Sequence, residues 1–355
     1  MRQVDYLIIG QGLAGTLLAY FLLRRQKEIV IVDQFNPSSA SQVGAGIFNP
    51  VTGQRNVKTW MADVLFPFAE STYTEMESYL DCTFYHRMNL VKLFSDDHDR
   101  EDWSAKMRTS DISCYVTNDG IPEFKNQWVV NSLGGVELKN TGYVDMVKLT
   151  TVFKVWMITE NLLVERKFDY NDLVILEDAV RWKDIQARKI VFCEGYKARQ
   201  NPFFQWLPFV FSKGEMLTIH DEKLNLTNIL NKGIFVLPIG GDTYKVGSTY
   251  TWNDLDENPT EEGKAGLNQR LGQIITSSFT VFDHQAGIRP TVKDRKPLLG
   301  LHPEKQVMAI FNGLGTKGVS QAPFFANHLV EFLEERKPLE KTVDIRRFFK
   351  FYLAK

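Results

Sequence analysis

The sequence is poor in cysteine and carries almost no net charge. Its 355 residues include three cysteines, Cys82, Cys114 and Cys193, which lie far apart and form no C-x-x-C pair. This scattered, odd-numbered set argues against a disulfide framework and a zinc site, so we expect no bound metal and a reducing compartment, the cytoplasm. The formal net charge is −1, and this balance supplies no positive field that would hold nucleic acid.

A long uninterrupted hydrophobic run is also missing. Residues 6–23 are mostly apolar and uncharged, but Gly10, Gly12 and Gly15 interrupt them. A membrane span needs about 20 consecutive apolar residues, and neither a basic leader nor a small-residue cleavage pattern marks a signal peptide here. We therefore expect a buried strand, a glycine turn and a buried helix in this segment.

Apolar residues make up 44% of the chain, which is enough for two lobes with buried cores. The spacing of apolar and turn-forming residues predicts most of the helices and strands. Helices are expected at residues 13–25, 60–80, 259–278 and 320–334, and strands at 4–9, 28–32, 128–130, 135–138, 189–193, 235–239, 244–249 and 306–311. Residues 96–119 are polar and are expected to be irregular.

This order of elements predicts an α/β fold, α+β overall, with two parts. A discontinuous Rossmann-like domain that binds a dinucleotide is expected at residues 1–80, 141–213 and 281–355. An inserted antiparallel β-sheet lobe that binds substrate is expected at residues 81–140 and 214–280. The tail, residues 343–353, mixes basic and aromatic side chains. It either touches a membrane surface or packs as a helix on the dinucleotide domain, and its short length favours packing.

The strongest local motif is Gly10-x-Gly12-x-x-Gly15, which follows the first expected strand and opens the first expected helix. The first glycine permits a tight turn, the second lets the backbone approach a pyrophosphate, and the third lets helix and strand pack closely. The helix N-terminus then offers free N–H groups to the phosphates. Asp33 ends the second expected strand, where a carboxylate accepts hydrogen bonds from ribose hydroxyls and repels a 2′-phosphate.

The motif occurs once, at the start of the chain, and no second fingerprint for NAD(P)H follows it. A single site without an evident acid–base pair favours a cofactor that stays bound and carries the redox chemistry itself, which indicates FAD rather than NAD.

Five blocks of sequence together resemble the FAD-dependent amine oxidase family that contains D-amino-acid oxidase, glycine oxidase and monomeric sarcosine oxidase. The first is the glycine motif with Asp33 and the loop SSASQVGAGI at 38–47. The others are IVFCEG at 190–195, YKVGST at 244–249, AGIRPTVKDRKPLLG at 286–300 and NGLGTKGVSQAP at 312–323. The last two are the most specific, and the resemblance is weakest at about residues 81–140.

The resemblance implies FAD bound by residues of these blocks and by Phe168. The implied set is Gly10, Gly12, Leu13, Ala14, Gly15, Asp33, Gln34, Ser41, Gly46, Ile47, Phe168, Cys193, Glu194, Gly195, Gly313, Leu314, Gly315, Thr316 and Lys317. The arginine segment lacks the cysteine that covalent-flavin relatives carry there, so non-covalent FAD is expected.

Arg289 is the first candidate for the substrate site, because in similar proteins the arginine of G-x-R-P pairs with the substrate carboxylate. A guanidinium fork matches a carboxylate with two parallel hydrogen bonds and so fixes the position of the α-carbon. Orientation is most of the catalytic task when a hydride is transferred. The alternative is that Arg289 neutralises Asp283 or Asp294.

Four further candidates come from the same resemblance. Lys317 is expected at the flavin N1–C2=O edge, where positive charge stabilises reduced flavin, and Lys245 above flavin N5, where it assists oxygen reduction. Lys58, with Arg55, follows a loop that carries two arginines in sarcosine oxidase-like proteins, and Tyr250 lies near the position of a histidine in some relatives. Each lysine has the alternative of a solvated surface residue.

These observations predict an FAD-dependent oxidoreductase that removes a hydride from the carbon beside the nitrogen of a small amine or amino acid. The imine product would then hydrolyse, and O2 or a quinone would accept the electrons. Two alternatives stay open: a flavin oxidoreductase that acts on a modified tRNA base, and a non-catalytic dinucleotide-binding protein.

Overall fold

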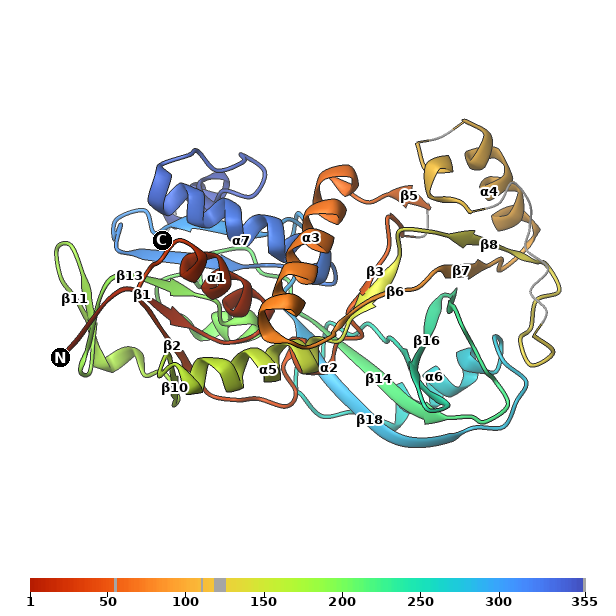
Figure 1. Cartoon of the computed structure of the whole chain (residues 1–355). Coiled ribbons are helices and arrows are strands. Elements are labelled where there is room, and N and C mark those ends of the chain that lie inside the picture. The colour runs from red at the N-terminus through yellow and green to blue at the C-terminus, as the bar shows by residue number, and fades with distance from the viewer. Residues whose placement is uncertain (54–55, 110, 118–125, 354–355) are drawn as a thin grey trace.

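The computed structural model describes residues 1–53, 56–109, 111–117 and 126–353. The chain forms an elongated molecule with two large β-sheets, one toward each end, and most of the long helices cover the sheet that contains the N-terminal strand (Figure 1).

The first sheet is built on parallel strands with apolar side chains on both faces. Burial on both faces is why these strands have nearly continuous apolar sequences. The order across the sheet is β10 (Leu163–Glu165), β2 (Ile29–Asp33), β1 (Arg2–Ile9), β13 (Ile185–Phe192), β12 (Val180–Trp182) and β11 (Leu173–Ile175); β20 (Met308–Asn312) also pairs with β13, and β19 (Leu298–Leu301) with β20. At its carboxyl end β1 leads into Gly10, and β2 ends at Asp33.

Four long helices pack on one face of this sheet. They are α1 (Leu13–Arg24), α3 (Ala62–Leu80), α5 (Met146–Thr159) and α7 (Gly318–Glu335). The other face packs against the chain's end, where Phe348, Phe349 and Tyr352 of the short helices η4 (Ile345–Phe348) and α8 (Phe349–Leu353) contact the core. The tail is thus a packed helix, the alternative that its length favoured.

The second sheet lies at the other end of the molecule. Its order is β18 (Thr280–Arg289), β14 (Ser212–His220), β17 (Thr243–Gly247), β16 (Ile234–Gly240), β15 (Ile229–Lys232), β7 (Leu90–Leu93) and β8 (Gly135–Leu138). One face packs on α6 (Glu261–Leu271) and the other on Trp103 of α4 (Asp97–Thr109). Short strands complete the structure: β3 (Ile47–Phe48) pairs with β9 (Gly142–Val144), which pairs with β6 (Tyr85–Arg87), and β4 (Val51–Thr52) pairs with β5 (Val57–Lys58).

The predicted α/β fold with a parallel dinucleotide sheet and a second sheet is confirmed. The second sheet is antiparallel except where β15 runs parallel to β7. Its edge strand β18 begins at Thr280, so residues 281–289 lie in this sheet, although the sequence analysis assigned them to the dinucleotide domain. The chain therefore passes from one sheet to the other at Arg289, the residue expected to bind substrate.

Two local predictions are wrong. The segment expected to be irregular contains the helix α4, and the carboxylate of Asp96, just before it, accepts a hydrogen bond from the N–H of Asp99 at 2.7 Å. Helix-capping contacts and an ion pair between Lys106 and Asp102 at 2.5 Å stabilise this helix, although its sequence has no apolar stripe. Residues 128–130 make only an isolated bridge, from Val129 to Ile275. Among the described residues, no helix is long and apolar enough to cross a membrane.

Candidate active site

A large cavity lies where the two sheets meet. Its volume is about 2020 Å³, against roughly 300–1,000 Å³ for a typical small-molecule site. The wall is made by the glycine turn after β1, the end of β2, the end of β13, and the segments at 39–49, 287–296 and 312–321. The first of these segments contains the short helix α2 (Ala40–Val43) and the strand β3. The space suffices for an extended dinucleotide together with a small substrate.

The glycines after β1 keep this wall open because no larger residue fits. Gly10 has φ +100°, and a Cβ there would lie 2.6 Å from the carbonyl oxygen of Cys193. A Cβ on Gly15 would lie 1.9 Å from the carbonyl oxygen of Gly10, so only glycine allows α1 to pack this closely on β1. The N-terminus of α1 at Gly12 therefore faces the cavity as a site for an anion.

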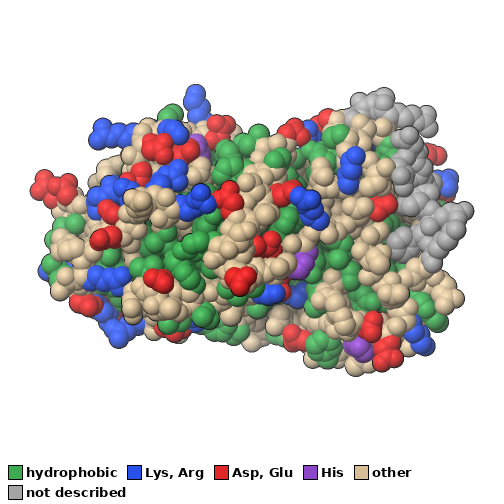
Figure 2. Space-filling model, in the orientation of Figure 1, with side chains coloured by type: hydrophobic (Ala, Val, Ile, Leu, Met, Phe, Trp, Pro, Cys, Tyr) green, Lys and Arg blue, Asp and Glu red, His purple; other side chains and the backbone are tan. Residues whose placement is uncertain are grey.

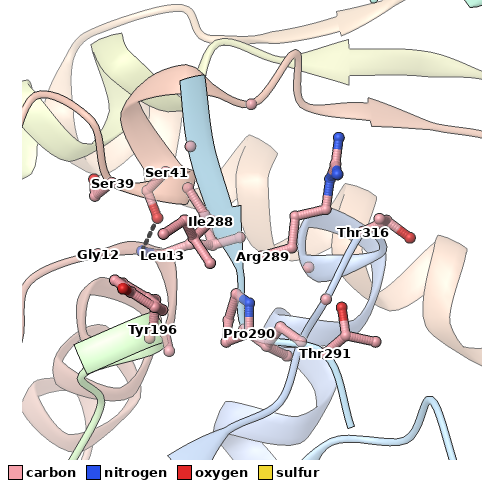
Figure 3. Close-up of a pocket in the computed structure, with 18 of the residues that line it drawn as sticks. Gly12, Leu13, Ser39, Ser41, Tyr196, Ile288, Arg289, Pro290, Thr291 and Thr316 are labelled. Carbon is pink, nitrogen blue, oxygen red and sulfur yellow. Dashed lines mark hydrogen bonds between the residues drawn. The ribbon is translucent and has the colours of Figure 1, made fainter. Parts of the chain in front are cut away.

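Two polar side chains complete this cradle. The Asp33 carboxylate accepts a hydrogen bond from the N–H of Gln11 at 3.0 Å, which holds it beside the glycine turn. The Ser41 hydroxyl accepts from the N–H of Leu13 at 3.0 Å (Figure 3). An adenosine ribose beside Asp33 and a diphosphate over Gly12 match the chemistry of these groups, so the residues present fit FAD.

A second glycine turn closes the opposite wall. Gly313 has φ +76°, and its N–H donates to the side chain of Asn312 at 2.8 Å. The Asn312 amide donates in turn to the carbonyl oxygen of Gly195 at 2.9 Å. The N–H of Gly315 donates to the carbonyl oxygen of Pro290 at 3.2 Å, which joins this turn to the end of β18. Residues far apart in sequence thus converge on one cavity.

Arg289 extends into the cavity from the last position of β18, away from Gly12 and Leu13 (Figure 3). Its guanidinium donates to the Ser248 hydroxyl at 2.8 Å and to the carbonyl oxygens of Lys213 and Thr249, each at 3.2 Å. Burial lowers its pKa from the ordinary value, but an arginine stays charged. Within the described part of the chain it pairs with no carboxylate; Asp294, one proposed partner, binds Arg347 instead at 2.8 Å.

Two lysines lie at the same end of the cavity. The Lys317 ammonium donates to the Thr52 hydroxyl at 3.0 Å, and burial lowers its pKa, with repulsion from Arg295 adding to the effect. The Lys296 ammonium lies 3.3 Å from the centre of the Trp60 ring. Burial, together with repulsion from Lys317, lowers the pKa of Lys296 to about 8.

Aromatic side chains form part of the rim. The Arg289 guanidinium carbon lies 4.3 Å from the centre of the Tyr250 ring, and Tyr250 stacks on Trp252 with ring centres 6.2 Å apart. Both rings line the cavity and are more than half exposed, at 52% and 58%. The Tyr196 hydroxyl donates to the carbonyl oxygen of Leu255 at 2.9 Å, which ties this segment to the end of β13.

Glu194 is a buried carboxyl on the cavity wall. Tyr170 bonds to one of its oxygens, and the Asn201 amide donates to the other at 2.7 Å. Burial raises the pKa of Glu194 to about 7. Its neighbour Cys193 is fully buried as well, and burial raises the pKa of that thiol.

Nearly all residues predicted to hold the cofactor line this one cavity. The lining set is Gly10, Gly12, Leu13, Ala14, Asp33, Gln34, Ser41, Gly46, Ile47, Phe168, Cys193, Glu194, Gly195, Gly313, Leu314, Gly315, Thr316 and Lys317. Gly15 lies behind the wall, where it serves the packing of α1 on β1.

Two predicted catalytic lysines lie elsewhere. Lys245 is not part of the cavity lining, and burial lowers its pKa while Asp145 and Asp283 act in the opposite direction. The Lys58 ammonium binds the Asp63 carboxylate at 2.7 Å, also outside the lining. Their positions support neither the oxygen-reducing role nor the substrate-binding role, and Arg55 lies outside the described residues.

Sequence analysis missed Lys296, Trp60 and Tyr196. Lys296 and Tyr196 fall inside or directly after blocks that the family resemblance singled out, but no motif marks them. Trp60 meets Lys296 only through the fold. Among the described residues no group of three or more His, Cys, Asp or Glu side chains is placed to hold a metal.

Comparison with known proteins finds relatives named for tRNA modification, and the match covers only part of their length. The tRNA 5-methylaminomethyl-2-thiouridine biosynthesis bifunctional protein of Legionella pneumophila subsp. pneumophila (strain Philadelphia 1) is 23% identical over 315 residues. The match covers 84% of this chain but 45% of that protein, so the chain spans about half of that relative's length.

Other relatives match along their whole length. Glycine oxidase of Bacillus subtilis (strain 168) is 20% identical over 351 residues, which cover 91% of this chain and 90% of that protein. The crystal structure of iminodiacetate oxidase from Chelativorans sp. BNC1 superposes with a TM-score of 0.79 at 22% identity, covering 97% of this chain and 98% of that one. The family model described as FAD dependent oxidoreductase matches residues 5–332. The chain therefore belongs to the family of FAD-dependent oxidoreductases.

Proposed function

We propose that this enzyme oxidises the carbon beside the nitrogen of a small amine that carries a carboxylate. The observation that carries the proposal is the Arg289 guanidinium, which lies in the same cavity as the glycine cradle and forms no ion pair with a described carboxylate. A guanidinium with hydrogen bonds only to neutral oxygens retains the capacity to bind an anionic ligand. The relatives named for oxidation of glycine and iminodiacetate support a substrate of this class.

The chain's own residues would do three things in this reaction. Arg289 would hold the substrate carboxylate and so fix the position of the α-carbon, which is the largest part of the task. Tyr250, on the guanidinium, would keep Arg289 in place. Lys317 would supply positive charge at the second glycine turn. When bound, FAD supplies the two-electron acceptor for the hydride that leaves the α-carbon, and the imine product hydrolyses in water.

Gly10, Gly12 and Asp33 are the residues that we propose to hold the diphosphate and the adenosine ribose of FAD. No cysteine occurs between residues 286 and 300, so we propose that the flavin is bound without a covalent link. Acid precipitation that leaves the yellow colour on the protein pellet would contradict this part of the proposal.

Anaerobic flavin reduction tests the function. Purified enzyme is mixed without oxygen with glycine, N-methylglycine, alanine and proline of both hands, aspartate and iminodiacetate, and with amines that lack a carboxylate. We expect at least one carboxylate-bearing amine to bleach the visible flavin absorbance, and amines without a carboxylate to do so poorly. If no amine bleaches the flavin, the proposal is wrong. Hydrogen peroxide formed in air then identifies O2 as the acceptor, and reoxidation only by quinones identifies a dehydrogenase.

A substrate on tRNA is not favoured by the site. Asp254, Asp256 and Glu257 lie on the segment after β17 that also carries Tyr250 at the rim. Asp254 and Asp256 share the Lys213 ammonium at 2.8 and 2.6 Å, so the three acids keep a net negative charge that would repel phosphates. On the face in Figure 2, basic and acidic side chains are interspersed rather than gathered in a basic field. Binding to tRNA that collapses steeply with added salt would revive this alternative.

A further inference from the structure

Three basic side chains line the cavity from two segments that are joined by a hydrogen bond. Arg289, Lys296 and Lys317 all line it. The end of β18 and the turn before α7 are joined by the hydrogen bond from the N–H of Gly315 to the carbonyl oxygen of Pro290. Arg289 precedes Pro290 in sequence and Lys317 follows Gly315 by two positions, so the bond connects the two segments that carry these cations.

The charges at this end are unbalanced. Among the residues that the structure describes, Arg289, Lys296 and Lys317 bind neutral partners: the Ser248 hydroxyl, the face of Trp60 and the Thr52 hydroxyl. The nearest acid in the sequence of this wall, Asp294, attracts the Lys296 ammonium, but its two oxygens accept hydrogen bonds from Arg347 at 2.8 and 3.4 Å.

The position of Lys296 is specific. Its ammonium lies 3.3 Å from the centre of the Trp60 ring, and Trp60 is itself stacked on Phe325 of α7 with ring centres 5.7 Å apart. A cation over an indole face is stabilised by about 0.5–2 kcal/mol. Lys317 reaches the same place through Thr52, whose hydroxyl bonds that of Thr59, the residue before Trp60, at 3.0 Å. The two lysines are therefore neighbours in the cavity wall, and burial together with repulsion from Lys317 lowers the pKa of Lys296.

Two like charges held together in a partly buried wall are unfavourable unless an anion binds between them. One carboxylate in the fork of Arg289 leaves the Lys296 ammonium with Asp294, already bound by Arg347, as its anionic neighbour. We place the FAD diphosphate at the glycine cradle, at the N-terminus of α1, and Figure 3 shows Arg289 directed away from that cradle.

We infer that the substrate is an amine with two carboxylates, one bound by Arg289 and the other by Lys296 together with Lys317. This inference rests on the proposed function and narrows it to acidic amino acids and N-carboxymethyl amines. The two anchors bind opposite ends of one molecule, so the carbon beside nitrogen is fixed from both sides, and an amine with one carboxylate is held from one side only.

Calorimetric titration with non-oxidisable acids tests the second anchor without turnover. The FAD-bound enzyme is titrated with succinate and glutarate and with the monocarboxylates propionate and butyrate. We expect the wild type to bind the dicarboxylates at least tenfold more tightly. Lys296→Met should remove that difference, and Lys296→Arg should keep most of it. Lys341→Met is the matched control, because Lys341 is an exposed lysine outside the cavity lining, and it should bind like the wild type.

Two results would overturn the inference. One is equal binding of mono- and dicarboxylates by the wild type. The other is a Lys296→Met variant that loses affinity for both classes equally or that loses FAD, because Lys296 would then serve the cavity or the flavin in general.

Anaerobic flavin reduction separates this inference from the proposed function. If iminodiacetate or aspartate reduces the flavin of the wild type with a lower half-saturating concentration than glycine and N-methylglycine, both proposals stand. If glycine or N-methylglycine is preferred, the second anchor is wrong and amine oxidation stands. If no amine reduces the flavin, the proposed function itself fails, and the calorimetric result still decides whether two carboxylates bind.

Discussion

The guanidinium of Arg289 lies over the ring of Tyr250, with its central carbon 4.3 Å from the ring centre. The two residues come from different segments, the end of β18 and the loop after β17, which flank β14 on either side. The ring packs on the face of the guanidinium, whose terminal nitrogens donate only to neutral oxygens. Arg289 is therefore held in one orientation while its charge remains available to a ligand.

Tyr250→Leu should raise the KM for carboxylate-bearing substrates about 2- to 30-fold, because the ring's attraction for the guanidinium is worth about 0.5–2 kcal/mol. Tyr250→Phe should stay within about twofold of the wild type, since the face of the ring remains. Steady-state kinetics with both variants would check this. A Phe variant as impaired as the Leu variant would show that the hydroxyl matters and the ring does not.

Gly214→Ala should displace the Arg289 guanidinium while Arg289 itself is unchanged. A Cβ at Gly214 would lie 1.8 Å from a terminal nitrogen of Arg289, so the guanidinium must move. We expect a loss of at least tenfold in affinity for carboxylate ligands with the FAD content unchanged, measured by titration and by absorbance. Gly266→Ala in α6 is the control, because a Cβ there has open space. Normal carboxylate binding by Gly214→Ala would mean that Arg289 is not the anchor.

Gly15→Ala should abolish FAD retention. The new Cβ would lie 1.9 Å from the carbonyl oxygen of Gly10, so α1 must move away from β1 and the phosphate cradle must open. The ratio of flavin to protein absorbance after purification measures this, with circular dichroism to confirm that the chain is folded. A folded variant that keeps its flavin would contradict the proposed cradle.

The stability of the protein should depend on the ionisation of Glu194, whose pKa is about 7 against an ordinary value of 4.5. Below pH 4.5 the carboxyl is protonated in both states. Between pH 4.5 and 7 it ionises in the unfolded chain first, so the stability it contributes is lost as the pH rises toward 7. Over this range the free energy of unfolding should fall by about 3 kcal/mol relative to Glu194→Gln, whose amide mimics the protonated form.

Denaturant unfolding of both proteins in saturating FAD, at several pH values, measures that difference. Parallel curves for the wild type and Glu194→Gln would mean that Glu194 is ionised in the folded protein across this range.

The first glycine motif was predictable because its role depends on local chemistry, whereas Arg289 was singled out by the resemblance of its segment to the family. Gly10 needs a positive φ and Gly15 a close backbone approach, and both requirements are readable from a strand, a turn and a helix in sequence order. Asp33 is likewise at the end of a strand whose apolar run is plain. The sequence could therefore predict the location of the dinucleotide cradle and much of its lining.

Other features depend on contacts between distant segments. Lys296 becomes notable only because Trp60 lies beneath it, and no pattern in the sequence pairs these residues. Lys245 is on β17, but on this strand the cavity lining begins two residues further on, at Gly247. The alternation of side chains along a strand predicts which face each one lies on, but it does not predict how far a cavity extends along the strand. The helix α4 lacks the apolar periodicity on which helix prediction depends, since capping and ion pairs support it.

The most direct test of the account is stopped-flow flavin reduction of Arg289→Met with two matched amines, N-methylglycine and N-methylethylamine, which differ in the carboxylate. For the wild type and for the control Lys341→Met, the amine with the carboxylate should react far faster at equal concentration. Arg289→Met should lose at least 100-fold in the second-order rate constant for N-methylglycine and little for N-methylethylamine, because only the first binds the guanidinium. Equal losses for the two amines, or no loss for N-methylglycine, would contradict the claim that Arg289 positions the substrate.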